Sequence, residues 1–261
     1  MEYTIQKGNL TLTADTEGAE LHALTVSGLP ILWDAKPEAW GRHAPVCFPW
    51  CGNMDGWFED GGKKYPEASM RHGFVRSMEH TLAEQQADAM TFRLEWPGDD
   101  RLWPWSFRFE TEHKVENGRF VTTCTAVNTG ERDMPVQFGF HPALRCPFLS
   151  GTVLEDYQVR FDNGTVITLH KELFDMDSMC FPGMGAWARL EHRPTGKYLQ
   201  VDTAGYDYVL LWSKPNIPGF VCIEPWQGYP GLGHDLMARP KARLLPAGEQ
   251  KSWQQIVTPH L

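Results

Sequence analysis

Apolar and polar residues alternate with a period of two along most of this chain, and turn-forming residues recur about every ten positions. This pattern is typical of many short antiparallel strands with one buried face. No stretch has the 3.6-residue period over a length sufficient for a helix, and only short turns are expected near residues 171–174 and 82–87. The sequence therefore predicts an all-β protein.

Several strand pairs can be placed from local sequence. The clearest hairpin comprises residues 107–115 and 120–127, because the Asn-Gly step between them readily adopts a positive φ. A second hairpin is predicted over residues 190–201, with R-P-T-G-K as its turn. Residues 9–14 and 19–26 are predicted to be neighbouring strands, joined by a turn at D-T-E-G.

The length of 261 residues suits one large or two small domains, and β-sandwiches of this size commonly form one. Because no repeat or linker divides the chain, we expect a single domain over residues 1–261. Two segments, 37–70 and 133–151, are predicted to be long irregular loops. Loops of this length are usually functional or disordered, and their Arg, His and Trp content favours a function.

Charge and composition exclude several classes of partner. The formal net charge is −9, and no basic run is present that follows a phosphate backbone, which argues against nucleic acid. The N-terminal residues alternate in polarity, unlike a signal peptide, and no apolar stretch approaches the roughly 18 residues of a spanning helix. Six cysteines without a C-x-x-C pair indicate reduced core thiols. We expect a cytoplasmic protein without a membrane partner.

The motif V-C-I-E-P-W-Q-G places an acid inside an apolar run. Pro225 favours an extended conformation of Glu224, because its ring clashes with a helical predecessor. In a strand, Cys222 and Glu224 share one face, while Val221 and Ile223 share the other. Such a carboxylate either reaches water at a sheet rim, where it pairs with a surface arginine, or is held in place for chemistry.

The motif F-G-F-H-P-A-L repeats this construction with a histidine. His141 follows strand-like aromatic residues and precedes Pro142, just as Glu224 precedes its own proline. A lone histidine in such a run is often a satisfied core residue. Two rigidly placed side chains of these types, however, are the components of a general acid and general base pair.

A third motif, R-H-G-F-V-R, combines Arg71, His72 and Arg76 around a glycine. Gly73 is expected to let the backbone approach a ligand closely, and the guanidinium groups suit hydroxyls or a phosphate. The alternative is a solvated arginine-rich loop. Eleven tryptophans, among them Trp226, also suit sugar rings, whose C–H faces pack on indole.

Motifs of other enzyme classes are missing. The sequence contains no G-x-G-x-x-G, G-x-x-x-x-G-K-[ST], G-x-S-x-G or H-E-x-x-H, and no H-x-H pair. His72, His141 and Glu224 would form a known metal-ligand set if they met in space. The preferred interpretation of these three residues involves no metal.

The order of four motifs resembles that of the aldose 1-epimerase (galactose mutarotase-like) family. These motifs are A-P-V-C-F-P-W-C-G, R-H-G-F-V-R, F-G-F-H-P-A-L and F-V-C-I-E-P-W-Q-G, and the resemblance extends from the first strands to about Ile256. It is closest to the branch with H-G-F-x-R and E-P-W. The resemblance implies a large antiparallel β-sandwich and an isomerase that acts on a small sugar without a cofactor. The sequence leaves the oligomeric state open between a monomer and a homodimer.

The resemblance also implies roles for individual residues. Glu224 matches the general base of the family, His141 the general acid and His72 a sugar-binding histidine beside the ring oxygen. Asn53 stands where many relatives carry an arginine, which leaves that contact open to Arg42, Arg71 or Arg76. The sugar-binding aspartate of the family finds a match in Asp177 within F-D-M-D-S-M.

The implied reaction opens the sugar ring by taking a proton from the C1 hydroxyl and giving one to the ring oxygen. We expect Glu224 to take the first proton and His141 to start as an imidazolium, because a nearby carboxylate favours the charged imidazole. Three alternatives remain: a hexose-6-phosphate 1-epimerase, a non-catalytic carbohydrate-binding or regulatory protein, and a glycoside hydrolase or lyase. The last of these requires two facing carboxylates.

Overall fold

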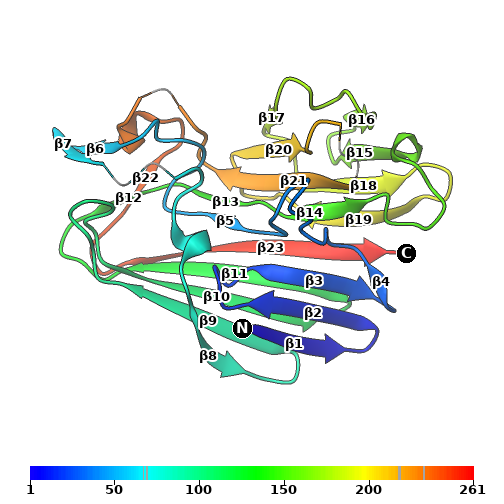
Figure 1. Ribbon diagram of the computed structural model, residues 1–261, viewed down its shortest axis with the longest axis horizontal. Coiled ribbons are helices and arrows are strands. Elements are labelled where there is room, and N and C mark those ends of the chain that lie inside the picture. Colours follow the sequence, from blue (N-terminus) through cyan, green and yellow to red (C-terminus); the bar gives the residue numbers. More distant parts are fainter. Residues whose placement is uncertain (67, 69, 217–218, 232) are drawn as a thin grey trace.

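The computed structural model describes residues 1–66, 68, 70–216, 219–231 and 233–261. Strands dominate it, as the alternation of the sequence predicts (Figure 1). Within these residues the helical segments are short 3-10 turns: η1 (Val75–Ser77), η2 (Leu154–Asp156) and η3 (Leu236–Ala238). None of the described residues forms a helix long and apolar enough to cross a membrane.

Three antiparallel sheets make up most of the fold. The largest has the order β16 (Val166–Thr168), β15 (Tyr157–Phe161), β18 (Trp187–His192), β19 (Lys197–Asp202), β23 (Gln250–His260), β11 (Arg119–Asn128), β10 (Phe107–Glu116), β9 (Ala89–Trp96) and β8 (Thr81–Gln85). The second contains β17 (Met179–Pro182), β20 (Tyr208–Trp212), β21 (Gly219–Gln227), β13 (Phe138–Phe140) and β5 (Val46–Cys47), and β14 (Ala143–Cys146) also pairs with β21. The third is β1 (Glu2–Lys7), β2 (Leu10–Asp15), β3 (Leu21–Val26) and β4 (Leu29–Pro30).

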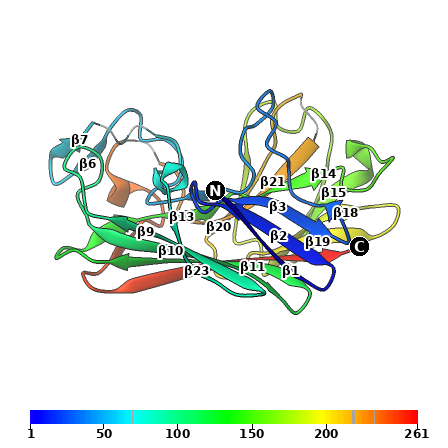
Figure 2. The same ribbon diagram turned by 60° about the horizontal axis from the view of Figure 1, so that its bottom comes forward.

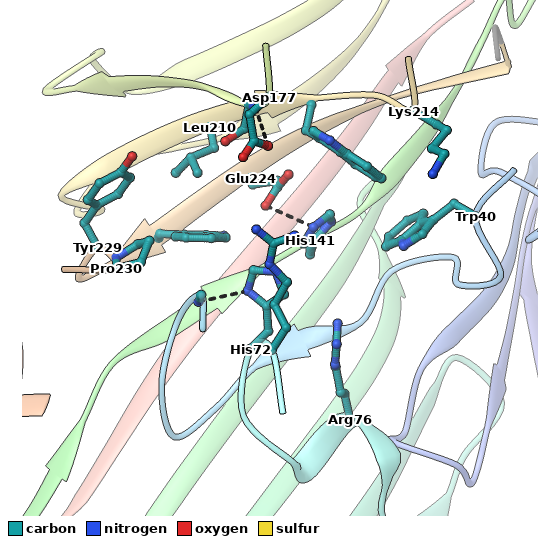
Figure 3. A pocket seen from close by; sticks show the side chains of 15 residues that line it. Trp40, His72, Arg76, His141, Asp177, Leu210, Lys214, Glu224, Tyr229 and Pro230 are labelled. Atoms are coloured by element: carbon teal, nitrogen blue, oxygen red, sulfur yellow. Dashed lines mark hydrogen bonds and ion pairs between the residues drawn. The ribbon is translucent and has the colours of Figure 1, made fainter. Parts of the chain in front are cut away.

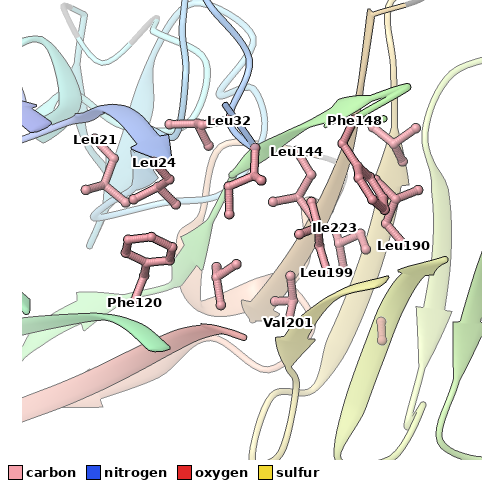
Figure 4. Packing of buried hydrophobic residues seen from close by; sticks show 14 of the residues in the cluster. Leu21, Leu24, Leu32, Phe120, Leu144, Phe148, Leu190, Leu199, Val201 and Ile223 are labelled. Atoms are coloured by element: carbon pink, nitrogen blue, oxygen red, sulfur yellow. The ribbon is translucent and has the colours of Figure 1, made fainter. Parts of the chain in front are cut away.

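The three sheets share one buried apolar cluster. Leu24 comes from the four-stranded sheet, Phe120 and Leu199 from the nine-stranded sheet, and Ile223 from the sheet that contains β21 (Figure 4). The sheets therefore pack face to face, and Figure 2 shows β1, β2 and β3 lying against β10 and β11. This arrangement confirms the predicted antiparallel β-sandwich.

A second buried cluster accounts for several of the tryptophans. Trp50, Trp103, Trp105 and Trp253 pack there with phenylalanines such as Phe138. These indoles are core residues and do not form a sugar-binding surface. Two small sheets border this part of the molecule, β6 (Phe58–Asp60) with β7 (Lys63–Tyr65) and β12 (Met134–Val136) with β22 (Arg243–Leu245).

The predicted hairpins are confirmed. Strands β10 and β11 pair in antiparallel register around a turn in which Asn117 and Gly118 have φ values of 49° and 74°. Strands β18 and β19 form the second hairpin, and β2 and β3 pair as neighbours. All six cysteines are free thiols, and only Cys180 is not fully buried.

Two loop predictions and one turn prediction need correction. Residues 133–151 contain β12, β13 and β14, while residues 37–70, of which 67 and 69 lie outside the described residues, contain β5, β6 and β7. Residues 82–85 belong to strand β8. These strands are two to five residues long, and several contain proline or glycine, so too few alternating positions exist to show a period.

Leu199 provides a test of the shared core, because it is fully buried opposite Leu190. We expect Leu199→Ala to lower the free energy of unfolding by about 2–5 kcal/mol, through lost apolar contact and the cavity left behind. Val166→Ala on the edge strand β16, where the side chain is 40% exposed, should change it by less than about 0.5 kcal/mol. Urea denaturation measures both, and equal losses would contradict the assigned core.

Candidate active site

Strand β21 places Glu224 and His141 across from each other. Strand β13 pairs with β21 at Phe138↔Gln227 and Gly139↔Trp226, and β14 pairs with it at Ala143↔Cys222. Both pairings keep the same register, and continuing that register through the gap between β13 and β14 sets His141 opposite Glu224. Residues directly opposite in an antiparallel pair point to the same face of the sheet.

The two side chains meet in the cavity that this face lines. His141 Nε2 lies 3.4 Å from Glu224 Oε2, and the side chains are only 8% and 2% exposed (Figure 3). The cavity has a volume of about 310 Å³. Its lining consists of Trp40, Gly52, Arg71, His72, Arg76, His141, Asp177, Ser178, Leu210, Trp212, Lys214, Glu224, Trp226, Tyr229 and Pro230. The volume fits a small ligand.

Burial controls the charge of the Glu224 and His141 pair. It raises the pKa of Glu224 well above its usual range, and Asp177 adds to this shift. Burial also lowers the pKa of His141 to about 3, and the charge of Arg76 acts in the same direction. These shifts oppose the expected imidazolium, because desolvation favours the neutral form of each partner.

His72 lies beside the pair in a fixed tautomer. The Gly52 backbone N–H donates to His72 Nδ1 at 3.1 Å, so Nδ1 is unprotonated and the neutral ring carries its proton on Nε2. Burial lowers the pKa of His72 well below its usual value, and the charge of Arg76 acts in the same direction. The ring centroids of His72 and His141 are 5.4 Å apart. His72 is thus held as a neutral side chain on the cavity wall.

Gly73 has a different role from the one expected. Its φ is +71°, and a Cβ atom there would lie 1.9 Å from the carbonyl oxygen of Phe48. The glycine is required because the backbone passes close to residue 48, with which it forms a parallel bridge. It serves packing of the chain that carries His72, not close approach to a ligand.

Aromatic side chains form another part of the wall. The rings of Trp40 and His141 are stacked, with centroids 4.9 Å apart and an interplanar angle of 30°. Trp212 meets His141 edge-on at 5.8 Å, and Trp226 meets His72 at 5.4 Å. The Trp226 Nε1–H donates to the Phe140 carbonyl at 3.2 Å, which fixes its indole ring.

Charged side chains complete the lining. Arg71, Arg76 and Lys214 line the cavity, and none of the three forms an ion pair or side-chain hydrogen bond with another residue that the structure describes. Asp177 also reaches the cavity, from a backbone with φ of +132°, and its Oδ1 accepts the Ser178 N–H at 2.7 Å. The site therefore offers unpaired cations close to the acid and base pair.

Two predicted binding residues lie elsewhere. Arg42 does not line the cavity: its Nη1 donates to Glu20 Oε2 at 3.1 Å and to the Arg76 carbonyl at 2.9 Å. Asn53 is exposed outside the cavity, and its backbone oxygen accepts from Arg239. Arg42 supports the backbone of Arg76 through this hydrogen bond. It therefore helps to position a cavity residue without lining the cavity itself.

Several lining residues were not among the sequence predictions. Trp40 and Trp212 are two of the eleven tryptophans. The high tryptophan content suggested aromatic residues at a sugar site, but it did not show which tryptophans would line the cavity. Lys214 follows β20 with no recognisable pattern around it, and Tyr229 lies in the segment after β21. Only strand pairing reveals Leu210, which lies opposite Glu224.

The fold is similar to that of galactose mutarotase-like proteins of known structure. A galactose mutarotase related enzyme from Lactobacillus acidophilus has a similar structure, with a TM-score of 0.92 at 24% identity over 100% of this chain and 98% of that one. A galactose mutarotase-like protein from Lactobacillus casei gives 0.90 at 22% identity over the whole of both chains.

Sequence comparison gives the family. Residues 1–181 match the family described as aldose 1-epimerase, and the chain belongs to this family of isomerase-type enzymes. The chain is also similar to the plasmid-encoded protein LacX of Lactococcus lactis subsp. lactis, with 29% identity over 265 residues, 87% of this chain and 88% of LacX.

Glu20 provides a test of the support beneath Arg76. Burial raises the pKa of this carboxyl, but hydrogen bonds from His43 and Arg42 outweigh burial and hold the pKa below its usual value. Glu20→Gln should therefore cost roughly 1.5–3 kcal/mol of unfolding free energy at neutral pH. Because the folded pKa is depressed, this contribution is present above about pH 4.3 and is lost as the pH falls through the folded value.

Urea denaturation of wild type and Glu20→Gln at pH 7 and at pH 3 measures the effect. The difference between the two proteins should shrink at the lower pH. Glu17→Gln is the matched control, because this exposed acid lies 3.9 Å from the same arginine and should cost less than about 1 kcal/mol. A difference that is independent of pH would contradict the assigned charge of Glu20.

Proposed function

We propose that this protein is an aldose 1-epimerase that interconverts the α and β anomers of an aldohexose. The observation that carries the proposal is the contact of His141 and Glu224 at 3.4 Å inside a cavity of sugar size. The two groups exchange protons with different atoms of one small ligand, as a general acid and a general base must. Trp40, Trp212 and Trp226 line the cavity, and indole is the kind of side chain that packs against the C–H faces of a sugar ring.

The proposed reaction moves two protons. Glu224 as carboxylate takes the proton of the C1 hydroxyl while His141 as imidazolium gives one to the ring oxygen, so that the C1–O5 bond breaks. Rotation about C1–C2 turns the aldehyde, and reversal of both transfers closes the ring to the other anomer. His72, with its proton on Nε2, is available to donate to a sugar oxygen. No step requires a metal or a nucleotide.

The charge of the pair fits this cycle. With one proton shared, the pair alternates between an ion pair before ring opening and a neutral pair in the open-chain state. Burial favours the neutral pair in the empty cavity. Sugar hydroxyls that donate to Glu224 shift the balance towards the ion pair when the ring is closed, because they stabilise the carboxylate. Both states then lie close enough in free energy to interconvert.

The proposed site also bears on domain organisation. It combines Trp40 from the first third of the chain with His141 and Glu224 from later strands. A site assembled over this span favours one domain over residues 1–261.

Substitution of the pair tests the proposed reaction. We expect Glu224→Gln and His141→Asn each to lower kcat by about 10²- to 10⁴-fold, because each removes one proton carrier. Polarimetry or NMR exchange between anomers measures the rate for several aldoses. The exposed contact between His170 and Glu172, 3.2 Å apart outside the cavity, supplies matched controls in His170→Asn and Glu172→Gln.

The two control variants should keep the wild-type rate. If wild type binds sugars but accelerates no anomer exchange, the protein is a carbohydrate-binding protein of the same fold. If both pair variants keep the full rate for every sugar tested, the assigned roles of Glu224 and His141 are wrong.

A second candidate function is a hexose-6-phosphate 1-epimerase. The observation that favours it is a set of cations on the cavity wall, Arg71, Arg76 and Lys214, which have no ion-pair partner among the residues that the structure describes. A phosphate is the kind of anion that such donors bind, with Arg as a fork and Lys as a point charge. Under this candidate the same acid and base act on the sugar ring, and only the substrate class changes.

Removal of single cations separates the two substrates. If the substrate is phosphorylated, Arg71→Met and Lys214→Met should raise KM for a hexose 6-phosphate by roughly 10- to 100-fold, because each removes a charge-assisted hydrogen bond. KM for the free hexose should stay within about twofold. Lys251→Met, an exposed change on β23, is the control. Equal changes in KM for the two sugars would reject the phosphorylated substrate.

A further inference from the structure

Three different metal-ligand types meet where His141 and Glu224 line the cavity, with Cys222 beside them. The ligating atoms of His141, Cys222 and Glu224 all lie within 4.8 Å of one another. Cys222 and Glu224 share a face of β21, two residues apart, and His141 lies opposite them on the neighbouring chain segment. The thiol is fully buried, and the side chains of His141 and Glu224 are only 8% and 2% exposed.

We propose that His141 Nε2, Glu224 and the Cys222 thiolate form a Zn²⁺ site, and that the bound ion blocks the proposed acid and base pair. Imidazole, carboxylate and thiolate are the ligands that zinc takes in proteins, and three protein ligands leave a fourth position for water or substrate. Inhibition by the ion rests on the proposed function, because it requires an epimerase activity that can be blocked. Binding of the ion does not depend on catalytic activity.

The distances suit a tetrahedral ion. With bonds of about 2.0–2.3 Å, two ligands of a tetrahedral zinc lie about 3.3–3.7 Å apart. His141 Nε2 and Glu224 Oε2 already have a separation of 3.4 Å. The Cys222 sulfur lies no more than 4.8 Å from the other two ligand atoms. To reach the separation that a tetrahedral ion requires, it must move by about 1 Å or less, which a change of side-chain torsion can provide.

Charge also favours a divalent ion at this place. Zn²⁺ with one carboxylate, one thiolate and one neutral imidazole forms a site without net charge, which a buried position tolerates. The nearby guanidinium groups of Arg71 and Arg76 repel a free cation but not such a neutral complex. On binding, the protons of the Cys222 thiol and the Glu224 carboxyl leave to solvent, as metal ligation by these groups requires.

The composition of the site differs from the His72, His141 and Glu224 set considered from the sequence. His72 uses Nδ1 to accept from Gly52, and it is not part of the close cluster. Cys222 takes its place because strand periodicity puts residues 222 and 224 on one face. The fourth position of the ion faces the cavity, since His141 and Glu224 both line it.

Calorimetric titration of the metal-free, untagged protein with ZnCl₂ tests the site. We expect one ion per cavity and at least about 10-fold weaker binding in Cys222→Ser, because loss of a residue that binds the metal directly weakens binding at least as much as loss of a residue that only supports a ligand. Cys222→Ala is a second variant in case serine disturbs folding. Cys146→Ser is the matched control, since this thiol is equally buried in the core cluster and should leave binding unchanged.

Titration with Co²⁺ identifies the ligands, because a thiolate ligand adds an intense sulfur-to-metal absorption band. The partly exposed cluster of Glu2, Asp15 and His22 offers no thiolate, so an ion bound there would lack the band. Wild type should show the band, and Cys222→Ser should not. Zinc binding that persists unchanged in both Cys222 variants, or a cobalt complex without the band, would overturn the site.

The rate of anomer exchange gives a separate readout. Zinc should inhibit wild type and Cys146→Ser, and a chelator should restore the rate, while Cys222→Ser should remain active at the same zinc concentration. Zinc binding that depends on Cys222 in a protein without epimerase activity would reject the proposed function and keep the metal site. Anomer exchange without any zinc binding would reject the metal site alone.

Discussion

The register of β21 is the constraint on which the rest of the structure depends. This strand buries Val221 and Ile223 in the core shared by three sheets, and the period of two then forces Cys222 and Glu224 to the opposite face. A shift of one residue would move the carboxylate into the apolar core without a partner, at a high cost. Core packing therefore fixes the direction of the acidic side chain. The register of β21 determines both the stability of the core and the position of Glu224.

Hydrogen bonds to residues 43–45 hold the backbone around His141. Its backbone N–H donates to the Pro45 carbonyl at 3.0 Å, and the Ala143 N–H donates to the His43 carbonyl at 2.8 Å. The backbone N–H of His43 in turn donates to the Glu20 carboxylate, which precedes β3 of another sheet. A single buried carboxylate thus connects the four-stranded sheet to the position of the imidazole.

The sequence predicts long-range features only where a local pattern encodes them. The β10 and β11 hairpin was predictable because its alternation spans many residues around an Asn-Gly turn. The prolines after Glu224 and His141 predicted only extended backbone at each residue, and the expectation that the two side chains meet came from the resemblance of their motifs to those of the aldose 1-epimerase family. Lys214 and Trp40 have no such signature: strand pairing and packing between distant segments bring them to the cavity, so their places depend on contacts that no local window contains.

The same burial that makes the pair suitable for proton exchange makes it suitable for a divalent ion. Desolvation penalises separate charges on Glu224 and His141, so burial favours the neutral form of both side chains. In the proposed cycle this neutral pair corresponds to the open-chain state, and burial lowers the free energy of that state. A cavity that disfavours isolated charge still accepts a neutral assembly of ion and anions, and Cys222 supplies the second anion that such an assembly needs.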